Sequence, residues 1–82
     1  MRESLAKATE FVIFCIENTA ERLNVSGRDV YLALKSSDGI ASFLFPSYGT
    51  LHTQGKEYIV DETIQYLRIH NSSLIATKGG EV

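Results

Sequence analysis

The sequence predicts an all-α protein, a compact bundle of four to five short helices with a frayed C-terminal tail. Apolar residues recur at the helical period along two long segments, and helix-capping residues mark shorter ones between them. No segment needs a sheet partner, and 44% hydrophobic with 22% charged residues is the composition of an ordinary globule. We expect a single helical domain over residues 1–70 and a flexible tail over residues 71–82.

The clearest predicted helix covers residues 3–24. On a helical wheel one stripe is apolar and the opposite side is charged. The stripe consists of Leu5, Ala8, Val12, Cys15, Ile16, Thr19 and Leu23. The charged side consists of Glu3, Lys7, Glu10, Glu17 and Glu21. One side of this helix should therefore pack against the rest of the domain.

A capping box predicts the next helix, over residues 27–36. The Ser26 hydroxyl would accept from the backbone N–H of Asp29, and the Asp29 carboxylate would reach back. The apolar side of this helix is expected to contain Val30, Tyr31, Ala33 and Leu34.

A third short helix is predicted over residues 39–45, with Asp38 or Ser37 as its cap. Pro46 should stop this helix, because a proline ring does not fit in a helix interior. The turn-rich stretch 46–55 leaves room for one more helical turn.

Residues 55–70 form the last predicted helix, and the helical period is lost after Asn71. Its apolar stripe consists of Ile59, Val60, Thr63, Ile64, Tyr66 and Leu67. Across from the stripe lie Glu57, Asp61, Glu62, Gln65 and Arg68.

Charge and hydropathy exclude several classes of protein. Eight Lys and Arg against ten Asp and Glu give a net charge of −2, and residues 39–45 carry no basic side chain. Nucleic acid is therefore not an expected partner, because duplex binders need a basic field. The longest apolar run, from Phe11 to Ile16, falls far short of the roughly 20 residues of a membrane span. A single cysteine and an acidic N-terminus favour a cytoplasmic location.

The richest polar set lies in residues 51–61. His52 titrates near neutrality, Thr53, Gln54 and Lys56 are donors, and Glu57 would orient His52 as a base. This interpretation suggests a small ligand-binding or enzymatic domain. In the simpler interpretation Thr53 is the N-cap of the last helix and His52 packs over the helix end.

Metal binding and cofactors are not expected. Cys15, His52 and His70 lack the close pairing of a metal motif, and no glycine pattern matches a phosphate loop. Cys15 lies on the apolar side of the first helix, so a buried and inert thiol is expected.

Some large apolar residues miss the main stripes. Phe14 falls among charged residues of the first helix, and Tyr58 and Ile69 fall between Glu62 and Gln65 on the last one. Either other elements cover these residues, or they mark a surface for a partner protein or a second copy. A two-fold dimer through the first helix is compatible with this pattern.

Several short blocks resemble a family of short bacterial proteins known as domain of unknown function 3791. These blocks are residues 10–17, 37–40, 46–48 and, above all, 51–62, which read Leu-His-Thr-Gln-Gly-Lys-Glu-Tyr-Ile-Val-Asp-Glu. No activity is assigned to this family, so the resemblance does not imply a reaction. Members tend to be encoded beside, or joined to, ADP-ribosyltransferase-like proteins, which implies a partner-binding or antitoxin-like module.

The sequence thus favours a non-enzymatic protein-interaction module over an enzyme, and makes a DNA-binding regulator the least favoured alternative. The expected partner is a protein, and the resemblance implies an ADP-ribosyltransferase-like one. The residues expected to bind it are Phe14, Tyr48, His52, Gln54, Lys56, Glu57 and Tyr58.

Overall fold

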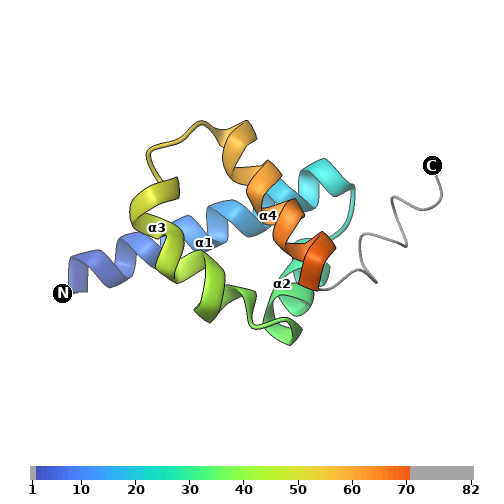
Figure 1. Cartoon of the computed structure of the whole chain (residues 1–82), viewed down its shortest axis with the longest axis horizontal. Coiled ribbons are helices and arrows are strands. Elements are labelled where there is room, and N and C mark those ends of the chain that lie inside the picture. Colours follow the sequence, from blue (N-terminus) through green and yellow to red (C-terminus); the bar gives the residue numbers. More distant parts are fainter. Residues whose placement is uncertain (1, 71–82) are drawn as a thin grey trace.

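The protein is an all-α bundle in which shorter helices pack against one long helix (Figure 1). The structure, a computed structural model, describes the backbone of residues 2–70 and the side chains of residues 6–70. The order of elements is α1 (Arg2–Leu23), α2 (Gly27–Ser36), the π-helical turn η1 (Ile40–Leu44), α3 (Phe45–Leu51) and α4 (Lys56–His70). The all-α prediction is confirmed. The predicted tail, residues 71–82, lies outside the described residues, so its flexibility stays a prediction.

Helix α1 is the centre of the bundle, since α2, α3 and α4 all pack against it. Its buried residues Ala8, Val12, Cys15 and Thr19 belong to the predicted stripe. Phe11, which lies outside the predicted stripe, is buried as well, because α3 covers that side of α1. The apolar arc of α1 is therefore wider than one packing partner would need.

Helix α2 begins and ends at serines. The Ser26 hydroxyl accepts from the backbone N–H of Asp29 at 3.0 Å, which confirms this half of the predicted capping box. At the other end the Ser37 hydroxyl donates to the carbonyl of Ala33 at 2.8 Å. Ser37 therefore closes α2 rather than capping the next helix. The chain turns at Asp38, which has a positive φ of 60°.

The prediction that Pro46 stops a helix is wrong. The helical backbone runs from η1 through Pro46 into α3, and Pro46 occupies the first turn of α3. Before the proline the backbone widens, so that the Phe45 N–H donates to the Ile40 carbonyl five residues back. A π-turn at this point relieves the crowding between a proline ring and the preceding turn, and a first-turn proline needs no N–H.

Gly39 lies where the turn before η1 meets α4. A Cβ at this position would come within 2.8 Å of both the Leu34 Cδ2 atom and the Tyr66 ring. The Tyr66 ring is held there, because it stacks on Phe43 at 4.7 Å and its hydroxyl donates to the Ser37 carbonyl at 2.8 Å. The absence of a side chain at Gly39 thus allows α4 to close over this turn.

Helix α4 packs on α1 through the stripe that its sequence predicts. Ile59, Val60, Thr63, Ile64 and Leu67 are buried, whereas Tyr66 is partly buried. Thr53 is not the N-cap of α4. The Gly55 carbonyl accepts from the Ile59 N–H instead, at 3.1 Å. None of the helices within residues 2–70 has the length and apolar character that crossing a membrane requires.

Candidate partner-binding surface

Aromatic rings organise the connection between α3 and α4. The Tyr48 ring of α3 meets Phe11 of α1 edge to face, with ring centres 5.5 Å apart. On its other side Tyr48 stacks against His52, at 4.3 Å and 17°. Tyr48 thus couples the core to an exposed histidine one helical turn later.

The position of His52 is fixed by its own backbone turn. Its Nδ1 atom lies 2.6 Å from the Tyr48 carbonyl oxygen. A carbonyl oxygen only accepts, so the Nδ1–H of His52 is the donor of this hydrogen bond. His52 thus lies at the C-terminal end of α3, whereas the simpler sequence interpretation placed it over the start of the last helix.

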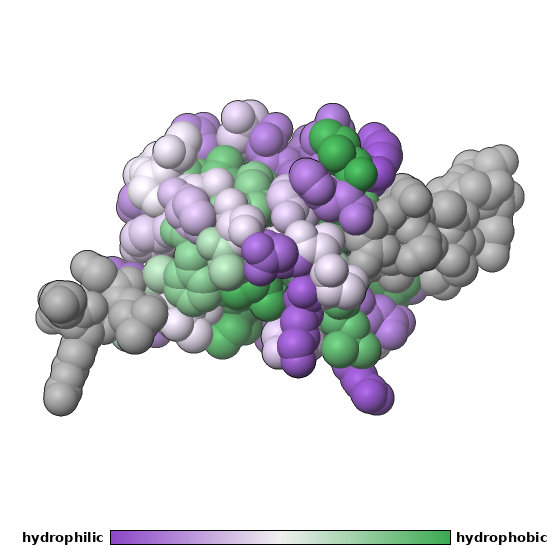
Figure 2. Space-filling model, turned by 60° about the horizontal axis from the view of Figure 1, so that its bottom comes forward, coloured by the Kyte–Doolittle hydropathy of each residue, from purple (hydrophilic) through white to green (hydrophobic). Residues whose placement is uncertain are grey.

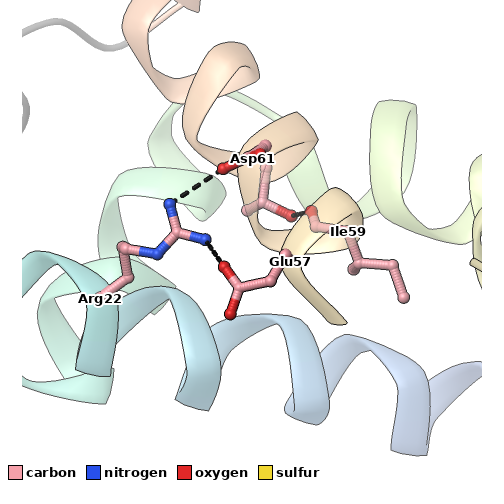
Figure 3. Close-up of polar contacts among 5 residues, drawn as sticks. Arg22, Glu57, Ile59 and Asp61 are labelled. Atoms are coloured by element: carbon pink, nitrogen blue, oxygen red, sulfur yellow. Dashed lines mark hydrogen bonds and ion pairs between the residues drawn. The ribbon is translucent and has the colours of Figure 1, made fainter. Parts of the chain in front are cut away.

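Glu57 does not orient His52, contrary to the catalytic interpretation. The Glu57 carboxylate accepts from the Arg22 guanidinium at 2.5 Å, and Asp61 accepts from the same guanidinium at 2.9 Å (Figure 3). The two acidic side chains lie one turn apart on α4, so one arginine from α1 reaches both. The adjacent carboxylates raise the pKa of Arg22, with the hydrogen bond to Asp61 as the largest cause.

The remaining predicted side chains of the 48–58 segment reach solvent. Gln54 and Lys56 are exposed, and Tyr58 is 50% exposed. Gln54 is held through its backbone, whose N–H donates to the Leu51 carbonyl at 2.9 Å. We define the 48–58 surface as Tyr48, His52, Gln54, Lys56 and Tyr58. It combines three rings with two polar side chains that can donate hydrogen bonds.

Phe14 differs from Tyr58 in its surroundings. It is only partly exposed and packs against the core cluster. Its neighbour Ile13 is instead 49% exposed. The apolar excess of α1 therefore reaches solvent through Ile13 more than through Phe14.

The outward face of α2 was missed by the sequence interpretation. Tyr31, expected on the apolar side, is 41% exposed, and Leu32 is 44% exposed. Leu32 is two residues from both Val30 and Leu34, about 160° around the helix from each at 100° per residue, so a helical wheel of α2 identifies it as an outward apolar residue.

Apolar surface occurs in separate areas. Figure 2 shows the largest apolar area of the displayed face where η1 and α3 lie in Figure 1, with smaller areas set among hydrophilic side chains elsewhere. Phe43, Phe45 and Tyr48, which pack against the core while staying partly exposed, belong to these elements.

Cys15 is buried between α1 and α4. Desolvation raises the pKa of its thiol to about 11, and a hydrogen bond with the Thr63 hydroxyl opposes this shift. The thiol is protonated at neutral pH and is a poor nucleophile or metal ligand. Among the described residues, no three His, Cys, Asp or Glu side chains come together in a way that would hold a metal ion.

One comparison with known proteins gives a match. The family model described as "Protein of unknown function (DUF3791)" matches residues 10–70, which include every helix apart from the first two turns of α1. No curated protein and no solved structure matches the chain.

Proposed function

The chain belongs to the DUF3791 family, and on this premise we propose that it is a non-enzymatic protein-interaction module that binds through the 48–58 surface. One observation carries the proposal: Tyr58 stands half exposed on the same segment as the stacked rings of Tyr48 and His52. Aromatic side chains that present a large area at little entropic cost are the most frequent anchors of protein interfaces.

The polar contacts of this segment support binding rather than catalysis. Glu57, the natural orienting group for a histidine base, is engaged by Arg22. The Nδ1–H of His52 is engaged by a backbone carbonyl. The hydrogen bond to the carbonyl holds the His52 ring in place, which reduces the entropy lost when a partner docks.

The partner that we propose is an ADP-ribosyltransferase-like protein, which the chain would neutralise as an antitoxin neutralises its toxin. This part of the proposal rests on the family resemblance. Phe14, which the sequence also predicted to contact the partner, packs against the core and lies outside the 48–58 surface.

Co-expression with such a protein, followed by calorimetric titration of the purified pair, tests the proposal. We expect micromolar or tighter binding, and a loss of about tenfold or more in affinity for Tyr58→Ala and for His52→Ala, as at interface hot spots. ADP-ribosyl transfer by the partner should fall when the wild-type chain is added.

Ile69→Ala is the matched control. Ile69 is 65% exposed on the same outward side of α4, about 16 Å further along the helix, so its loss should leave affinity unchanged. Absence of binding at micromolar concentration would overturn the proposed partner. Binding that Tyr58→Ala and His52→Ala leave unchanged would overturn the proposed surface.

A further inference from the structure

Two outward helix faces of the molecule have matching patterns of opposite charge. On α1 the residues at i, i+3, i+4 and i+7 are Glu10, Ile13, Phe14 and Glu17, which we call the α1 stripe. On α2 the residues at the same spacing are Arg28, Tyr31, Leu32 and Lys35, which we call the α2 stripe. This spacing places each set on one side of its helix.

The charges of both stripes lack partners within the described chain. Glu10, Glu17, Arg28 and Lys35 are exposed, and none takes part in the ion pairs of residues 6–70, which join Arg22 to Glu57 and Asp61. In each stripe the two charges flank two large apolar residues, and Ile13, Tyr31 and Leu32 are between 41% and 49% exposed. Burial of these apolar side chains would favour docking, and the charges would select the partner.

From this complementarity we propose that the α2 stripe of one molecule docks on the α1 stripe of a second copy. Seven residues of helix span about 10.5 Å, so the two glutamates and the two basic residues are equally far apart. Each apolar pair then meets the other between two ion pairs. The charged residues of the α1 stripe are all acidic, and those of the α2 stripe are all basic. Two α1 stripes, or two α2 stripes, therefore repel each other.

The contact is expected to be weak. It consists of two helix faces of two turns each, and interfaces below roughly 1,200 Å² are typical of transient association. This self-association is separate from partner binding, because the 48–58 surface contains none of the four charged residues of the stripes.

Sedimentation equilibrium of the full chain at low salt tests the proposal. We expect the average mass to rise between about 10 µM and about 1 mM, and the rise to weaken with added salt. A mass that stays monomeric at 1 mM overturns the proposal and leaves the α2 stripe to an acidic helix of another protein.

Charge reversal tests which faces meet. The variant Arg28→Glu/Lys35→Glu makes both stripes acidic, and Glu10→Lys/Glu17→Lys makes both basic. Each variant alone should associate about tenfold or more weakly than the wild type. An equimolar mixture of the two should associate again, because each molecule then offers the stripe that the other lacks.

Lys56→Glu/Arg68→Glu is the matched control, since it changes the net charge by the same amount on exposed residues of α4. It should retain wild-type self-association. Circular dichroism checks that every variant keeps its helices. Self-association that survives reversal of either stripe, or a mixture of the reversed variants that stays monomeric, overturns the proposed contact.

Discussion

At the scale of single residues, helices α1 and α4 bury three small side chains that carry a thiol or a hydroxyl. Cys15, Thr19 and Thr63 are fully buried. The Thr63 hydroxyl donates to the Ile59 carbonyl at 3.0 Å. The Thr19 hydroxyl has no hydrogen-bond partner, and a buried unpaired hydroxyl costs stability. Nothing in the structure explains why a threonine occupies this position.

The Cys15 thiol should make stability fall at alkaline pH. Folding raises its pKa from 9.0 to about 11, so the folded state holds the proton more tightly than the unfolded chain. The contribution of the protonated thiol to the free energy of unfolding is fully present below pH 9 and is lost as the pH rises toward 11. A two-unit shift corresponds to about 2–3 kcal/mol at most.

Urea unfolding at pH 8 and at pH 11 measures this contribution, with Cys15→Ala as the reference. The tyrosine and lysine side chains titrate in both proteins, so their difference isolates the thiol. The wild type should lose more stability than Cys15→Ala between the two pH values. Equal losses would contradict the assignment.

At the scale of elements, glycines in two neighbouring helical segments have opposite roles. Gly39 precedes η1 and has no room for a Cβ, whereas a Cβ at Gly49 of α3 would have no neighbour within 4 Å. Neither glycine has a positive φ. Packing alone, rather than backbone conformation, therefore distinguishes the two positions.

Gly39→Ala should destabilise the protein by about 1–3 kcal/mol, because Leu34 and the stacked Tyr66 ring must move. Gly49→Ala should instead stabilise it by about 0.5–1 kcal/mol, since alanine is the better helix former. Thermal unfolding of the two variants beside the wild type measures both effects. A stabilising Gly39→Ala would mean that α4 does not close over this turn.

At the scale of the whole molecule, α1 organises the fold because α2, α3 and α4 all pack against it. The Arg22 ion pairs join the last turn of α1 to the first two turns of α4, 35 and 39 residues away in sequence. These side chains are largely exposed, so the pairs fix the relative position of the helix ends more than they stabilise the fold.

Arg22→Ala should lower the melting temperature by a few degrees at low salt and by less at high salt, because salt screens exposed charges. Arg68→Ala, which removes an exposed arginine of α4 without an ion-pair partner among residues 6–70, serves as the control. A loss that is equal at low and high salt would show that Arg22 acts through packing of its aliphatic stem.

The sequence alone determined helices α1, α2 and α4, because each is specified locally. The apolar period of α4, the Ser26 cap and the turn residues act within a few positions of one another, and they predicted α1, α2 and α4 to within a residue at most ends. The family, too, follows from short blocks of sequence.

Only the tertiary structure decided which apolar residues remain outside and which charges pair. Phe14 falls among charged residues on the helical wheel yet packs on the core, whereas Tyr31 faces solvent. Glu57 lies five residues from His52, yet Arg22 from the far end of α1 holds it. Pro46 continues a helix because the preceding turn widens. Burial, ion pairing and helix continuity at these residues depend on which other parts of the chain pack against them. The apolar period of a single helix carries no information about those neighbours.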